Sequence, residues 1–182
     1  MSAVFKITYS WQKRREPLPF GEDDYVDASP LSLALQHFLA NWEGGFVVQI
    51  DDTKLRFDLR PDLSTVFQEI PDVLKKLTLA SAAPAELYFF EQGTDLTLLL
   101  ERRESVIIIQ FAKGPSAGNR FSDLPGTRFT APADLFFIEW IRFAQAVLDH
   151  LTGLLPDLVN EESCRDYRAS LRALESSVVF RK

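Results

Sequence analysis

The chain has 182 residues, 46% of them hydrophobic and 25% charged, which is typical of a folded globular protein and excludes a largely disordered one. A formal net charge of −6 gives no basic footprint for nucleic-acid phosphates, and the single cysteine, Cys164, excludes an internal disulfide. The N-terminus has no signal-peptide pattern and the strongest apolar runs, 106–109 and 135–138, are too short to span a membrane, so we expect one cytoplasmic domain over 1–182.

The first third of the chain predicts a strand, a helix and a hairpin. Residues 3–11 alternate apolar and polar, as a half-buried strand does. Its core-facing side chains would be Phe5, Ile7, Tyr9 and Trp11. Ser29-Pro30 predicts a capped helix start and Gly44-Gly45 its end. Residues 46–50 and 54–59 then predict a hairpin with one wet face.

The middle of the chain predicts a broken helix and a meander. Residues 62–79 have a helical period that Pro71 interrupts, so we expect a kink or two short helices. Three antiparallel strands follow, at about 86–91, 96–101 and 105–112. The third is apolar on both faces over 105–111, and we expect helices or a second subunit to cover both of its sides.

The last third predicts a long loop and two helices. Residues 113–131 are rich in Gly and Pro and show no period, whereas Pro132 begins a strongly apolar helix that we expect to be the central buried one, at about 133–152. A final helix is expected at about 158–176 and a short extended tail at 178–180. The whole pattern predicts an α+β fold in which an antiparallel sheet of about five to six strands, including the C-terminal-half meander, packs against about four helices.

The sequence holds no familiar catalytic, cofactor or metal motif. His37 and His150 each lie in a predicted helix without a second ligand one turn away. Cys164 falls on the apolar side of the last predicted helix, which is typical of packing rather than of a nucleophile. The glycine-containing segment 114–119 lacks the lysine and the following helix of a phosphate loop. We therefore expect no cofactor and no metal, and we lean toward a protein that is not an enzyme.

Two loops supply the candidate partner-binding residues. The acidic candidates are Glu22, Asp23, Asp24 and Asp27. Their spacing does not fit a calcium loop, but it suits a patch that docks on a basic protein surface, extended by Asp51, Asp52 and Asp58 if these lie on the same side. The candidates in the long loop are Arg120, Asp123 and Arg128. Long loops in compact domains are often functional, which is why these three residues are chosen.

In size, acidic charge and lack of a catalytic motif, the chain resembles the small α+β proteins that bacteria use as immunity proteins or antitoxins. This resemblance implies a non-enzymatic protein whose partner is another protein, with a second copy of the chain as a further option. The alternative is a small-molecule-binding protein, or an enzyme without a familiar motif, whose site lies near loop 113–131. Neither nucleic acid nor membrane is expected as a partner.

Overall fold

The structure, a computed structural model, describes residues 4–19, 28–79, 84–90, 94–116, 121 and 128–179. The described strands are β1 (Phe5–Lys13), β2 (Trp42–Ile50), β3 (Thr53–Asp58), β4 (Ala85–Phe89), β5 (Leu96–Arg103), β6 (Val106–Lys113) and β7 (Arg128–Pro132). The described helices are α1 (Pro30–Asn41), α2 (Ser64–Val66), α3 (Ile70–Thr78), α4 (Ala133–Leu154) and α5 (Glu162–Val179), with short helical turns at Leu59–Leu63, Phe67–Glu69 and Pro156–Asn160.

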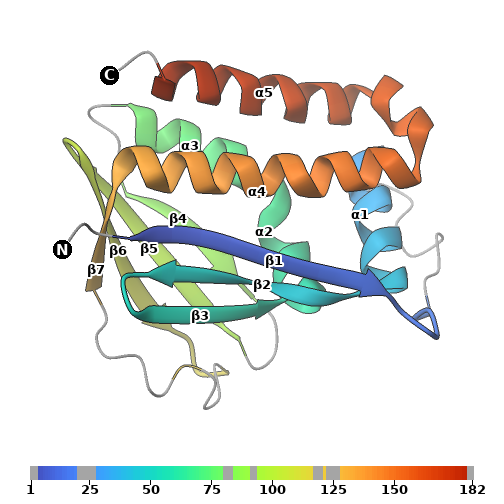
Figure 1. Ribbon diagram of the computed structural model, residues 1–182, viewed down its shortest axis with the longest axis horizontal. Helices are drawn as coiled ribbons and strands as arrows, with labels where there is room; N and C mark the ends of the chain where they lie inside the picture. The colour runs from blue at the N-terminus through green and yellow to red at the C-terminus, as the bar shows by residue number, and fades with distance from the viewer. Residues whose placement is uncertain are drawn as a thin grey trace.

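The strands form two antiparallel sheets, ordered β1-β2-β3 and β4-β5-β6-β7 (Figure 1). The α+β class is confirmed and the predicted number of strands is roughly right, but the strands of the described residues form two sheets, of three and four strands, rather than one. Each sheet has one apolar face, and the two apolar faces share a core, as the stacked rings of Phe57 and Phe89 show with centroids 4.3 Å apart. The expected meander is present as β4-β5-β6, and β7 extends it by one strand.

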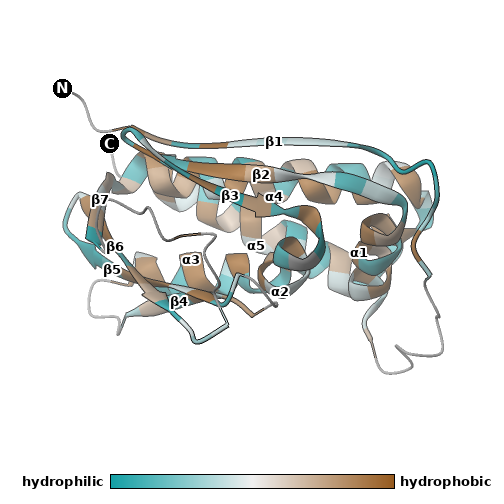
Figure 2. Cartoon of the chain, turned by 90° about the horizontal axis from the view of Figure 1, so that it is seen from below, coloured by the Kyte–Doolittle hydropathy of each residue, from teal (hydrophilic) through white to brown (hydrophobic). Residues whose placement is uncertain are grey.

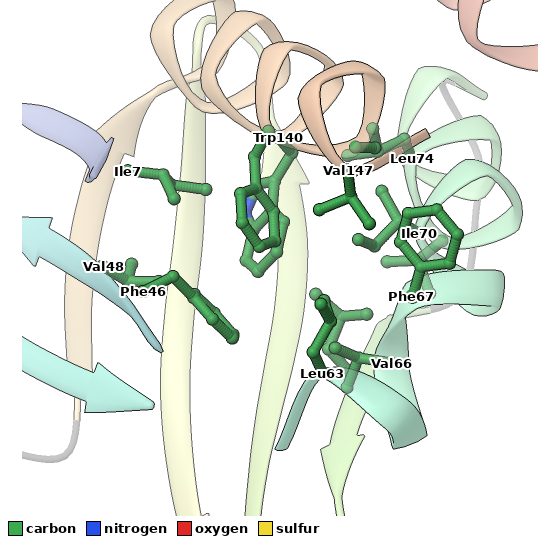
Figure 3. Close-up of a cluster of buried hydrophobic side chains, with 14 of the residues drawn as sticks. Ile7, Phe46, Val48, Leu63, Val66, Phe67, Ile70, Leu74, Trp140 and Val147 are labelled. Atoms are coloured by element: carbon green, nitrogen blue, oxygen red, sulfur yellow. The ribbon is translucent and has the colours of Figure 1, made fainter. Parts of the chain in front are cut away.

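Helix α4 closes one side of the space between the sheets. Figure 3 shows Trp140 pointing from α4 into the cluster, with Ile7 and Phe46 on one side and Leu63 on the other. The prediction that this helix is central is confirmed, yet it is not buried all round, because Leu135 and Ile138 are exposed. Helix α5 then packs on α4 and α3, and α1 contacts both α4 and α5 (Figures 1 and 2).

One carboxylate fastens α4 to the edge of the first sheet. The backbone N–H of Ile7 on the edge strand β1 donates to Glu139 Oε2 at 2.8 Å, and Glu139 is only 9% exposed. Arg142 Nη2 lies 2.9 Å from the other oxygen, Glu139 Oε1. The edge strand thereby gains a partner for an N–H that no neighbouring strand pairs, and the buried charge gains a counter-ion.

The structure confirms two predicted helix signals and corrects the end of the first helix. The Ser29 side chain accepts from the N–H of Ser32 at the start of α1, as expected of an N-cap. The helix ends at Asn41 rather than at Gly44-Gly45, because both glycines belong to β2. They are needed there for close approach, since a Cβ on Gly45 would lie 2.2 Å from the Phe57 carbonyl oxygen. Pro71 lies in the first turn of α3, so the 62–79 segment is broken as predicted.

Three other expectations about side chains and ends are wrong. Tyr9 is 39% exposed rather than in the core, because at this point on the edge strand its ring stacks on Trp11 and against Phe143 instead of being covered. The predicted extended tail is helical at least through Val179, the last residue of α5. The expected loop 113–131 is interrupted by β7, whose first residue, Arg128, pairs with Gln110 of β6.

We expect Glu139→Ala to lower the free energy of unfolding by about 1–3 kcal/mol, because it leaves the Ile7 N–H buried without an acceptor. Glu139→Gln keeps an acceptor oxygen and should cost less. Urea denaturation, monitored by tryptophan fluorescence, measures the free energy of unfolding of both variants. Glu175→Ala on the exposed side of α5 is the control and should be close to neutral. Equal stability of Glu139→Ala and the wild type would contradict this role.

Candidate functional site

Most of the predicted partner-binding residues lie outside the described residues, namely Glu22, Asp23, Asp24, Asp27, Arg120 and Asp123. Arg128 is described, and it is exposed at the start of β7. Asp51 and Asp52 form the turn between β2 and β3 whereas Asp58 ends β3, so these carboxylates lie at opposite ends of the hairpin and do not form one patch. Phe121, inside the expected loop, is buried against Phe57, and Lys113 Nζ donates to its carbonyl oxygen.

Arg128 belongs to a surface that the sequence did not single out, the outward face of the sheet β4-β5-β6-β7. We call it the outer face, and its residues from the four strands are Glu86, Tyr88, Thr97, Leu99, Glu101, Arg103, Val106, Ile108, Gln110, Ala112, Arg128, Thr130 and Pro132. Phe90, directly after β4, adds its ring at 5.3 Å from that of Tyr88. Strand alternation places these side chains outward because their neighbours, such as Leu87 and Ile109, are buried in the core.

The outer face has apolar residues in its middle and no helix over it in the described chain. Ile108 is 8% exposed although it points outward, since Glu101 and Thr130 flank it in register on either side. The helices that contact this sheet most, α2, α3 and α4, share the core with its inward face, and Figures 1 and 2 draw no helix over the other side. The doubly apolar strand is therefore covered on one side by helices, and on the other by its neighbouring side chains.

Two hydrogen-bonded pairs of side chains hold the polar residues of the outer face in place. Arg103 Nε donates to Glu101 Oε1 at 2.8 Å, and this hydrogen bond, with the added charge of Arg128, holds the pKa of Glu101 below its usual value. The Tyr88 hydroxyl donates to Asp95 Oδ1 at 3.1 Å, and burial together with this carboxylate raises the pKa of Tyr88. The second oxygen of Asp95 accepts the backbone N–H of Ser116. Tyr88 is thus held in place from the loops at the end of the sheet.

A cavity among the described residues lies elsewhere, where α4 begins. It measures about 620 Å³, and its lining includes Arg102, Ser105, Asp134, Phe137 and Ser177. The Arg102 guanidinium lies 5.6 Å from the Phe137 ring centroid and donates to the carbonyl oxygens of Leu77 and Glu104 at 3.4 and 3.2 Å. A volume of this size suits a small ligand. Arg128, from the loop to which the sequence assigned a pocket, is not among the residues that line it.

The two histidines and the cysteine show no catalytic arrangement among the described residues. The His150 ring lies among those of Trp11, Phe38 and Trp42, whose centroids are 5.5, 4.9 and 4.5 Å from its own. Its Nε2 atom is buried without a hydrogen-bond partner. Burial lowers the pKa of His150 and raises the pKa of the fully buried Cys164 thiol, so both are favoured in their neutral forms.

Neither a metal site nor a membrane segment is found in the part of the chain that the structure describes. No group of three or more His, Cys, Asp or Glu side chains there is placed to hold a metal ion. No helix within those residues combines the length and the apolar character that crossing a bilayer needs. Comparison with models of known protein families, with curated proteins and with solved structures finds no match to this chain.

Burial of His150 in its aromatic cluster should make the stability of the protein depend on pH. Because the folded pKa lies below the usual value of 6.5, the unfolded chain binds the proton more readily than the folded protein does. Stability contributed by neutral His150 is therefore complete above pH 6.5 and falls as the pH drops below that value. We expect the urea midpoint of the wild type to decrease on acidification through this window, and that of His150→Phe to decrease less.

Trp11 and Trp42 report this change directly, since both rings contact His150. His37→Gln is the matched control, because it replaces an exposed histidine on α1 and leaves the rings around His150 in place. If His150→Phe and the wild type lose stability in parallel between neutral and mildly acidic pH, burial of neutral His150 is not the cause.

Proposed function

We propose that the protein is a non-enzymatic interaction module that binds another polypeptide through the outer face of the sheet β4-β5-β6-β7. The observation that carries the proposal is the exposed aromatic pair on this face: Phe90 is 68% exposed and Tyr88 39% exposed. Aromatic and arginine side chains are enriched where proteins bind one another, and an aromatic ring buries a large area with few rotatable bonds. An exposed phenylalanine gains most from such burial.

The charges on the outer face suit a protein partner. Glu86 and Arg128 are exposed on the two edge strands, and Arg103 pairs with Glu101 near the middle. Charges of both signs around an apolar centre give a surface specificity and steer association, whereas they add little to affinity when they stay at the rim. The half-buried Leu99 and the nearly buried Ile108 provide the apolar centre.

Two side chains of the face are held in place by contacts within the chain before any partner binds. The Tyr88 hydroxyl is held by Asp95, and the Arg103 side chain by two contacts to Glu101, at 2.8 and 3.3 Å. Side chains that are ordered before binding lose less entropy on association. A role for this chain as an immunity protein or an antitoxin stays a prediction from its size, its acidic charge and its lack of a catalytic motif.

The second candidate function is binding of a small molecule in the cavity where α4 begins. Its size of about 620 Å³ favours this function, as do the hydroxyl groups of Ser105 and Ser177 in its wall. It is the weaker candidate, because Arg102 already donates to two backbone carbonyl groups and the acidic residues Glu104 and Asp134 share the lining.

Photo-crosslinking inside the host cell tests the main proposal. A photoreactive phenylalanine analogue replaces Phe90, Tyr88 or Tyr9 in turn; Tyr9 is the matched control because it is a tyrosine exposed to the same 39% but lies on the other sheet. We expect a discrete crosslinked product from positions 90 and 88 and none from position 9. Products from position 9 alone, or from none of the three, would exclude the outer face as the binding surface.

A further inference from the structure

We propose that the polypeptide bound by the outer face is a second copy of this chain, packed face to face with the first. The two copies are related by a two-fold axis that lies between the two faces, parallel to the strands and above the gap between β5 and β6. The inference rests on the proposed function and names its partner. It comes from the order of charges along one row of the sheet.

The strand register places an acid and a base at the two ends of a single row. Glu86 of β4 pairs with Leu99 of β5, Leu99 pairs with Gln110 of β6, and Gln110 pairs with Arg128 of β7. The row therefore reads acid, apolar, amide, base from one edge of the sheet to the other. Three strand spacings separate its ends, which is about 14 Å. Glu86 and Arg128 of one chain thus lie at opposite edges of the face.

A half-turn about the proposed axis exchanges β4 with β7 and β5 with β6 but keeps each row at its own level. Glu86 of one copy then lies over Arg128 of the other, and the same pair recurs on the far side of the axis, as the symmetry of an isologous contact requires. Packed sheets lie about 10 Å apart, a gap that a glutamate and an arginine reaching from opposite sides can bridge.

The central strands of the face meet across the same axis. The rotation sets β5 of one copy over β6 of the other, so that Leu99 of one copy lies over Gln110 of the other, Glu101 over Ile108 and Arg103 over Val106. The second copy thereby adds a layer over the outward side of β6, which the described helices leave to neighbouring side chains. The Glu101–Arg103 pair stays within each chain, with Arg128 close enough to act on Glu101.

A second copy fits the charges of this face better than an unrelated protein does. A surface that binds a different protein needs only to complement that protein, and it has no reason to complement itself. Here one rotation pairs opposite charges at both edges and sets no like charges of this row against each other. The acidic residue, Glu86, and the basic residue, Arg128, are 42 positions apart in the sequence.

Sedimentation velocity over a range of protein concentrations tests the proposal with charge reversals. We expect the wild type to self-associate and Glu86→Arg and Arg128→Glu each to weaken this at least about tenfold, because each single change opposes two like charges at both edges. An equimolar mixture of the two single variants should associate again, since each edge of the mixed dimer then sets one arginine against one glutamate. The double variant should recover self-association by itself, because it exchanges the acid and the base without changing their pairing.

The recovery in the mixture also shows that both single variants are folded. Lys54→Glu, an exposed charge reversal on the other sheet, is the control and should associate like the wild type. A wild type that stays monomeric at every concentration overturns the proposal, and so does a dimer that neither reversal weakens. These results leave the proposed function standing if Phe90 or Tyr88 still crosslinks to a different protein in the cell, whereas both proposals fall if neither position 90 nor position 88 crosslinks to anything.

Discussion

The whole arrangement depends on α4 filling the space between two sheets that each have one apolar face. Trp140 and the phenylalanines around it supply the side chains that close this space, and the Glu139–Ile7 hydrogen bond fixes the helix to the edge of the first sheet. With α4 in that place, the apolar faces of both sheets turn inward together. Their other faces are left for solvent or for a partner, which is why the outer face of β4-β5-β6-β7 is available at all.

Local signals predicted the elements well where one residue type decides the conformation. Ser29 caps α1, Pro71 breaks the helical segment, and alternation in 86–111 gives the meander. Strand β7 was missed because its five residues, between a Gly- and Pro-rich stretch and Pro132, become a strand only by pairing with β6. The division into two sheets also depends on long-range pairing, which periodicity within a segment does not carry.

The candidate surface was harder to predict than the fold, for the same physical reason. Arg128 was chosen as a loop residue, and its true neighbours on the sheet follow only from the register of β6 with β7. The surroundings of His150 come from β1, α1 and β2, three elements that the sequence separates from it by more than a hundred positions. Tyr88 and Phe90, two aromatic residues that alternate with Leu87 and Phe89, are the one local signal from which this face could have been predicted.

The central claim is that the outer face is covered when the protein associates. Hydroxyl-radical footprinting with mass spectrometry, on dilute and on concentrated protein, measures this at single side chains. If the face is an interface between copies, Phe90 and Tyr88 are oxidised less in the concentrated sample than in the dilute one. Oxidation of Tyr9, which is as exposed as Tyr88 in the single chain, stays constant. Unchanged oxidation of Phe90 and Tyr88 in a sample that has associated would contradict the claim, because another surface would then form the contact.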